Sequence, residues 1–201
     1  MIRYDLRGHG DSEKPQHGFH VHRLAADLHD LMEHFGFERV ALLGCSLGCS
    51  IIWAFVELYG GTQISAALFV DQSPYQMASI DGEWQLGSKS IFSEGSLAHV
   101  RAELRNNPRL FYEETVKACL TRAPTNVEMS MYVNESLKSS HWFLGKLMAN
   151  HAHMDWRNVL PLVSCPALVF AGKKSKIFPW EGVAYAAENM PHAKLLSLIH
   201  I

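Results

Sequence analysis

An apolar run leads directly into a serine between two glycines in the stretch Val40-Ala41-Leu42-Leu43-Gly44-Cys45-Ser46-Leu47-Gly48. The apolar part is typical of a β-strand covered on both faces, which predicts a central parallel strand. From Leu47 the apolar residues recur at helical spacing, so the serine falls on a tight turn between a strand and a helix. Such a turn exposes Ser46 at the carboxyl edge of a sheet. It requires small flanking residues, because a Cβ at Gly44 or Gly48 would collide with the neighbouring strand and helix.

This turn makes Ser46 a candidate nucleophile. The following helix directs the positive end of its dipole toward the serine, and the Leu47 N–H points to the same place. Both can stabilise an oxyanion, so Leu47 is the candidate oxyanion donor. The alternative interpretation is a glycine-rich turn without chemistry. Cys45 and Cys49 are expected to be packing residues, since neither stands at the centre of the turn.

The rest of the chain alternates between strand and helix patterns. Residues 1–6 look like the end of a strand, a helix is expected over residues 21–35, and Gly36 follows it where a left-handed residue is favoured. After the serine helix come a strand over residues 64–70 and, much later, a strand over 165–172, a helix over 182–190 and a strand from 194 to 201. This alternation predicts an α/β fold with a mostly parallel sheet flanked by helices.

A different pattern separates the two halves of this alternation. Between about residue 75 and residue 155, aromatic residues and methionine mix with polar residues at helical spacing, and no convincing strand occurs. We therefore expect a single domain over residues 1–201, with a core of residues 1–74 and 156–201 and a helical insertion over about 75–155. The chain has 201 residues, of which 48% are hydrophobic, which is enough for one such core.

The composition limits the classes of partner. Lys and Arg number 18 against 20 Asp and Glu, a net charge of −2, and no basic run occurs, so nucleic acid is not an expected partner. The chain has neither a signal-peptide pattern at its start nor a run of 18 apolar residues, so we expect a soluble, cytoplasmic protein without a membrane partner. Four cysteines without a CxxC pair indicate reduced thiols. A small-molecule substrate is the expected partner, and the sequence indicates no oligomeric state.

The 12 histidines invite a metal interpretation. The closest pairs are His20 with His22 and His151 with His153. Neither pair has a third ligand at a recognisable spacing, so no metal site is predicted.

Four segments of the chain resemble the α/β-hydrolase superfamily in its common single-domain branch. Tyr4 to Ser12 resembles the motif after the fourth sheet strand, and Gly44 to Gly48 resembles the nucleophile elbow. Phe69 to Pro74 resembles the end of the sixth strand, and Asp155 to Val169 resembles the approach to the seventh. The resemblance covers nearly the whole chain. It implies a helical cap formed by the insertion, ester or related acyl chemistry on Ser46, and no cofactor.

The resemblance also implies a catalytic acid. The family usually has an aspartate shortly after the seventh strand, but residues 172–175 read Gly-Lys-Lys-Ser, and Ser175 cannot stabilise an imidazolium as a carboxylate does. Some members, the haloalkane dehalogenases among them, take their acid from the end of the sixth strand, where this chain has Asp71. Asp71 is therefore the candidate acid. The alternative is that Asp71 caps the following turn together with Ser73 and Pro74.

The ends of the chain depart from the family pattern. The family's histidine follows the eighth strand, and His200, the only imidazole near that place, is the candidate base although no glycine precedes it. The family's first three strands have no counterpart, so we expect a fragment truncated at both ends. In that case residues 40–43 would lie on an unpaired sheet edge unless residues 2–6 pair with them.

These patterns lead to two hypotheses about function. The first is a serine hydrolase of small or medium-sized apolar ester or acyl substrates that reacts through Ser46, with Asp71 orienting the base. The second is a non-catalytic hydrolase-like fragment, or a ligand- or partner-binding pseudoenzyme, that lacks the catalytic histidine. A histidine within reach of Ser46 distinguishes them, because a serine hydroxyl without a base is a poor nucleophile at neutral pH.

Overall fold

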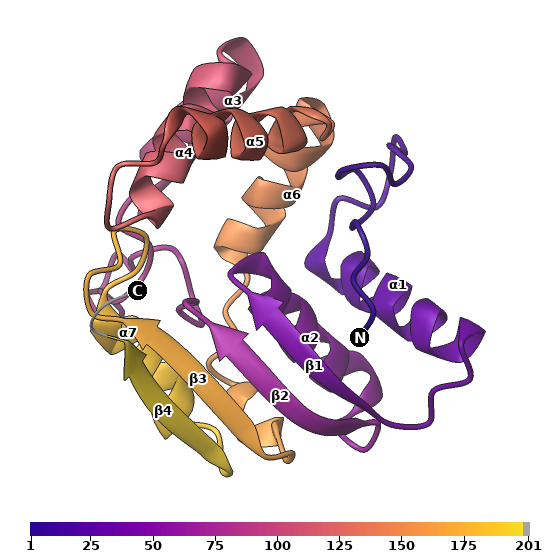
Figure 1. The fold of residues 1–201 in the computed structure, drawn as a ribbon. Helices are drawn as coiled ribbons and strands as arrows, with labels where there is room; N and C mark the ends of the chain where they lie inside the picture. Colours follow the sequence, from indigo (N-terminus) through magenta and orange to yellow (C-terminus); the bar gives the residue numbers. More distant parts are fainter. Residues whose placement is uncertain (199–201) are drawn as a thin grey trace.

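Four parallel strands form one sheet in the computed structural model, which describes residues 1–198 (Figure 1). Their order in space is their order in sequence: β1 (Val40–Cys45), β2 (Ile64–Val70), β3 (Ala167–Gly172) and β4 (Ala193–Leu198). Every neighbouring pair is parallel. Parallel neighbours need crossover connections, and helices supply them here. The predicted α/β fold with a parallel sheet is therefore confirmed.

Helices cover one face of this sheet. Figure 1 shows α2 (Leu47–Tyr59) and α7 (Trp180–Glu188) behind the strands, and α1 (Val21–His34) packs on α2. The eight residues of α2 from Cys49 to Val56 are all buried, because this helix lies between α1 and the sheet. Trp53 of α2 stacks on Phe69 of β2 with ring centroids 5.5 Å apart. Dense packing of this kind fixes the start of α2 relative to the strand ends.

The opposite face of the sheet carries no helix within residues 1–198. Leu43 (68% exposed), Leu168 and Leu196 project from it. Because successive side chains of a strand point to opposite faces, burial alternates along β1 and β3. The prediction that residues 40–44 form a central strand covered on both faces is therefore wrong for the described part of the chain, where β1 is an edge strand with one covered face.

The segment before α1 also differs from its prediction. Residues 1–6 form no strand, and they do not pair with β1. The outer edge of β1 therefore has no partner strand within the described residues. This is the unpaired edge that the sequence predicts when residues 2–6 do not pair with β1.

Most of the predicted helices and strands are confirmed. The α1 helix covers the expected span, and Gly36 beyond it has a φ of 65°. The α7 helix begins and ends two residues before the predicted span of 182–190. The predicted last strand is β4, and residues 199–201 of its expected span lie outside the described residues. Within residues 1–198, every helix is too short or too polar to cross a bilayer.

Four α-helices lie between β2 and β3, where a helical insertion was predicted, and a short 3₁₀ helix, η1 (Leu160–Leu162), follows them. The four α-helices are α3 (Glu94–Asn106), α4 (Pro108–Cys119), α5 (Asn126–Leu137) and α6 (His141–His153). Ser93 and Thr125 start α3 and α5 with capping boxes, which satisfy N–H groups of the first turn. Figure 1 shows the four helices beyond the end of the sheet toward which the strands point. They occupy residues 94–153, while residues 75–93 are irregular, and their role as a cap stays a prediction.

Candidate active site

Ser46 lies at the turn between β1 and α2, where the sequence predicts it. Its backbone has a φ of 49° and a ψ of −117°, and residues other than glycine rarely adopt a positive φ. Backbone hydrogen bonds from both the N–H and the carbonyl of Ser46 hold the turn in place. Ser46 N–H donates to Val70 O at 2.9 Å, and Ser46 O accepts from Cys49 N–H at 2.8 Å. Strain of this kind persists only where the surroundings enforce it, and it is concentrated at functional sites.

Gly44 and Gly48 flank the turn and have different roles. A Cβ on Gly44 would lie 2.4 Å from the backbone carbon and oxygen of Gly48 and 2.6 Å from Cys49 N. Glycine at position 44 therefore lets α2 start this close to β1. A Cβ on Gly48 would meet no described atom within 4 Å. The predicted collision is confirmed at Gly44 and is wrong at Gly48, because the space beside Gly48 is open.

The Ser46 hydroxyl donates to the amide oxygen of Gln72 at 3.3 Å. The Gln72 amide is itself oriented, because its nitrogen donates to the Ser73 carbonyl at 2.8 Å. Within residues 1–198 no histidine is hydrogen-bonded to Ser46, and the candidate base His200 lies outside the described residues. The Leu47 N–H belongs to the first turn of α2, where helical N–H groups have no intrahelical acceptor. This position suits an oxyanion donor, and the roles of Ser46 and Leu47 stay predictions.

Asp71 follows β2 directly and, like Ser46, has a positive φ, of 47°. Its carboxylate accepts a hydrogen bond from Ser175 Oγ at 2.8 Å, so it reaches the loop after β3. Burial raises the pKa of Asp71, and the Ser175 hydrogen bond acts in the opposite direction. Ser73, which belongs to the turn-capping alternative, donates through its Oγ to the Leu86 carbonyl at 2.8 Å and to the Tyr75 carbonyl at 3.2 Å, and that alternative stays open. The Asp71 carboxylate thus lies beside Ser175 in the loop after β3, where the family usually has its acid, and the catalytic role of Asp71 stays a prediction.

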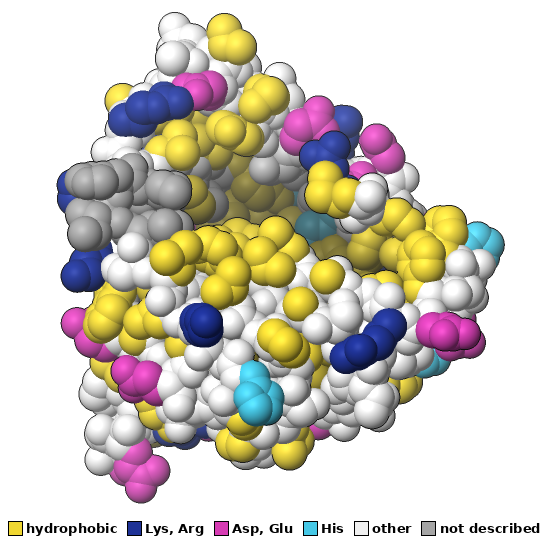
Figure 2. Space-filling model, turned by 60° about the horizontal axis from the view of Figure 1, so that its bottom comes forward, with side chains coloured by type: hydrophobic (Ala, Val, Ile, Leu, Met, Phe, Trp, Pro, Cys, Tyr) yellow, Lys and Arg dark blue, Asp and Glu magenta, His cyan; other side chains and the backbone are white. Residues whose placement is uncertain are grey.

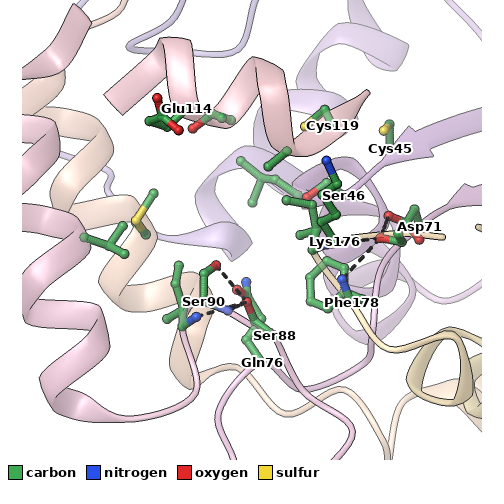
Figure 3. A pocket seen from close by; sticks show the side chains of 18 of the residues that line it. Cys45, Ser46, Asp71, Gln76, Ser88, Ser90, Glu114, Cys119, Lys176 and Phe178 are labelled. Carbon is green, nitrogen blue, oxygen red and sulfur yellow. Dashed lines mark hydrogen bonds between the residues drawn. The ribbon is translucent and has the colours of Figure 1, made fainter. Parts of the chain in front are cut away.

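A cavity of about 1030 Å³ contains these candidate residues. Ser46, Leu47 and Asp71 all line it, and the close-up view shows Ser46 and Asp71 near each other on the side of the sheet (Figure 3). The helices between β2 and β3 provide much of the apolar wall, including Phe111 of α4 and Leu147 of α6. The molecular surface is hollowed between largely hydrophobic walls (Figure 2). The fold therefore brings together residues that are 25 positions apart in the sequence, in a space suited to an apolar ligand.

The two cysteines of the turn differ in environment. Cys49 is buried, and its Sγ donates to the Gly44 carbonyl at 3.2 Å. Burial raises the pKa of the Cys49 thiol well above its usual range, so Cys49 is a packing residue, as predicted. Cys45 is exposed and lines the cavity, so the expectation that it packs in the interior is wrong. It is the last residue of an edge strand, and its side chain lies on the uncovered face of the sheet.

His151 is a cavity residue that the sequence patterns did not identify. Gln76 donates to its Nδ1 at 2.9 Å, and its Nε2 lies 2.9 Å from Ser50 Oγ. With Nδ1 accepting, the ring carries its proton on Nε2 and donates to the serine. All three side chains are buried. In the sequence, His151 stands out only as a histidine among apolar residues at helical spacing. That pattern does not indicate which side chains will form hydrogen bonds with it in the fold.

His151 also predicts a pH dependence of stability. Burial lowers the pKa of His151 from the ordinary value of 6.5 to about 4. Between these two values the unfolded chain binds more protons than the folded chain, so the free energy of unfolding falls as the pH falls. We expect this group to contribute a slope of up to about 1.4 kcal/mol per pH unit, with its full stabilisation present above pH 6.5. Urea denaturation of the wild type and of His151→Gln between pH 7 and 4.5 measures it. Equal slopes for the two proteins contradict this expectation.

The histidine pairs of the sequence have partners other than metals. His22 Nε2 lies 2.7 Å from a Glu57 carboxylate oxygen, and His153 Nε2 lies 2.5 Å from Glu94. Within the described part of the chain, no group of three or more His, Cys, Asp or Glu side chains is arranged to hold a metal ion.

Comparison with known proteins gives consistent matches. A family model described as alpha/beta hydrolase fold matches residues 1–200. The chain is 26% identical over 207 residues to the non-heme chloroperoxidase of Streptomyces lividans, a match that covers 98% of this chain and 72% of that protein. Its fold matches an esterase from Exiguobacterium antarcticum with a TM-score of 0.87, at 18% identity, over 96% of this chain and 70% of that one. A bromoperoxidase from Bacillus anthracis matches with a TM-score of 0.87, at 21% identity, over 97% of this chain and 71% of that one.

These matches agree with the parallel sheet, the strand-to-helix turn and the helices between β2 and β3. The chain spans 70–72% of the length of these three proteins. The family match covers all but one residue of the chain. This chain therefore belongs to the alpha/beta hydrolase fold family of hydrolase-type enzymes.

Proposed function

We propose that this protein is a serine hydrolase that acts on small or medium-sized apolar ester or acyl substrates, with Ser46 as the nucleophile. The observation that carries the proposal is the position of Ser46. It lies on a strained strand-to-helix turn with a φ of 49°, and it lines a cavity of about 1030 Å³. A hydroxyl in this position is accessible to a ligand and lies at the positive end of the α2 dipole.

The proposed reaction passes through an acyl-enzyme. Ser46 Oγ forms a bond to the substrate carbonyl carbon while its proton passes to the base, and the new oxyanion faces the Leu47 N–H. The bond to the leaving alcohol then breaks, and the alcohol takes the proton from the base. Water next attacks the acyl carbon and transfers a proton to the base, which returns it to Ser46 Oγ as the acid product leaves. Asp71 orients the base, for which we propose His200, and stabilises its charged form.

We also propose that the helices α3–α6 act as a cap over this reaction. Their apolar side chains, including Phe111 and Leu147, line the cavity opposite the sheet. An apolar wall favours acyl chains and reduces access of water to the carbonyl. In this arrangement residues 1–74 and 156–201 form the catalytic core and residues of about 75–155 form the cap. The esterase similar in fold is consistent with this chemistry.

A fluorophosphonate probe tests the proposal, because it phosphonylates a serine only when the hydroxyl is activated. We expect the wild-type protein to be labelled and the label to be located on Ser46 by mass spectrometry of the digested protein. Ser46→Ala should abolish labelling. Ser90→Ala is the matched control, since it removes another cavity-lining hydroxyl and should leave the label in place.

The second hypothesis, a non-catalytic relative, gives the opposite result. It is favoured by the absence of a histidine bonded to Ser46 within residues 1–198. If the wild-type protein unfolds cooperatively and still takes no label, the hydrolase proposal is wrong for this chain and the pseudoenzyme hypothesis replaces it.

A further inference from the structure

A polar network of residues other than the candidate catalytic ones borders the cavity. His151 comes from α6, Gln76 from the loop after β2 and Ser50 from α2, and hydrogen bonds of 2.9 Å join the histidine to each of the other two. They are among only six polar side chains that are buried in the described part of the chain. Burying polar groups is costly unless they are bonded, so a network assembled from three separate elements needs an explanation.

Two members of this network face the cavity that Ser46 also lines. His151 and Gln76 line the same cavity as Ser46, and Figure 3 shows Gln76 beside Ser88 and Ser90 on one wall. Ser50 of α2 is not a lining residue of the cavity and joins this wall through its hydrogen bond to His151. A ligand bound at Ser46 therefore shares one cavity with Gln76 and His151.

The network has hydrogen-bonding capacity that its own members do not use. Gln76 donates through its nitrogen to His151, and within residues 1–198 its amide oxygen forms no hydrogen bond. Gln76 lines the cavity, and this oxygen is not among the fully enclosed polar atoms that lack a partner. It can accept a hydrogen bond from a ligand.

The network is electrically neutral. Burial lowers the pKa of His151 to about 4, which leaves the ring uncharged at neutral pH. No ion pair within the described residues includes any of the three side chains. A charged ligand group would lose its hydration here without gaining a counter-charge, whereas a neutral group that hydrogen-bonds would be stabilised.

We propose that the wall formed by Gln76 and His151, with Ser50 bonded to His151 behind it, binds a hydroxyl group on the acyl chain of the substrate, so that hydroxyacyl esters are preferred over their unsubstituted counterparts. A hydroxyl both donates and accepts, so it fits either orientation of the Gln76 amide. Gln76 contacts this hydroxyl directly, while Ser50 and His151 position Gln76. The proposal rests on the proposed hydrolase function for the chemistry of the substrate, and it concerns a part of the cavity that takes no role in bond breaking.

Two measurements test this recognition site. The first compares kcat/KM for p-nitrophenyl 3-hydroxybutyrate and p-nitrophenyl butyrate. The second measures binding of butyramide, 3-hydroxybutyramide and 4-hydroxybutyramide, followed by the NMR signals of the His151 ring. We expect the wild type to prefer at least one hydroxylated ligand by about 3- to 10-fold, the effect of one hydrogen bond. That ligand should shift the His151 signals more than butyramide does.

Substitutions test whether this network causes the preference for hydroxylated ligands. Gln76→Met keeps the shape of the side chain without its hydrogen bonds, and it should bring the ratio between the hydroxylated and plain ligands close to one. Ser50→Ala removes the partner of His151 Nε2 and should reduce the ratio. Thr115→Val is the control, because it removes a cavity-lining hydroxyl on α4 and should leave the ratio unchanged.

The two measurements separate this proposal from the hydrolase proposal. Equal binding of all three amides by the folded wild type overturns the recognition site, whether or not Ser46 reacts. An unchanged preference in both Gln76→Met and Ser50→Ala overturns it as well. A network-dependent preference in binding, together with no ester hydrolysis and no fluorophosphonate label, supports the recognition site and overturns the hydrolase proposal.

Discussion

Gly44→Ala is expected to destabilise the protein by about 3 kcal/mol or more, a large part of the 5–15 kcal/mol that stabilises a typical domain. The new Cβ would lie 2.4 Å from the backbone of Gly48. Backbone atoms cannot turn away as a side chain can, so the start of α2 would have to move away from β1. This movement would also displace Ser46. Urea denaturation followed by circular dichroism measures the loss.

Gly48→Ala is the matched control for this prediction. Its Cβ would meet no described atom within 4 Å, and the residue lies in the first turn of α2. Alanine is favoured over glycine in a helix by up to about 1 kcal/mol, so this variant should be as stable as the wild type or more stable. If the two variants lose similar amounts of stability, close packing at Gly44 is not the reason for the glycine.

Asp71→Asn is expected to lower kcat for hydrolysis of p-nitrophenyl butyrate by about 10³- to 10⁴-fold. Removal of a carboxylate that orients a catalytic histidine has an effect of this size in serine hydrolases. The fold should be retained, because the amide oxygen that the substitution introduces can still accept the hydrogen bond from Ser175 Oγ. The free energy of unfolding should therefore change much less than the rate.

Ser175→Ala is the control for the acid. It removes the hydroxyl that donates to Asp71 at 2.8 Å and leaves the carboxylate in place. We expect a much smaller fall in rate than for Asp71→Asn, because the carboxylate that is proposed to orient the base is retained. If Asp71→Asn keeps more than a tenth of the wild-type rate, Asp71 is not the catalytic acid.

The strand-to-helix turn was predictable because its determinants are local. A run of apolar residues, two glycines and a helical period all lie within residues 40–59, and the structure places Ser46 between β1 and α2 accordingly. The parallel sheet was predictable for a related reason, since alternating strand and helix patterns leave few topologies open. The burial of β1 was not predictable, because an apolar run does not show which of the two faces of the strand another element covers.

The surroundings of the candidate site depended on contacts that no local pattern encodes. Asp71 was a candidate from its position alone, but its hydrogen bond to Ser175 joins residues 104 positions apart. The bond between Ser50 and His151 spans 101 positions. Before the fold is known, each of these side chains has many equally acceptable partners, so their pairing could not be read from the sequence.

Local chemistry along the chain was thus sufficient for the fold class, the family resemblance and the place of Ser46. Hydrophobic periodicity and turn residues act between residues that are close in the sequence, so their effects can be predicted from the sequence directly. The meeting of Asp71 with the loop after β3, the neutral polar wall around His151 and the uncovered face of the sheet were established by folding. They depend on how close distant segments come, which is set by the packing of all the elements together.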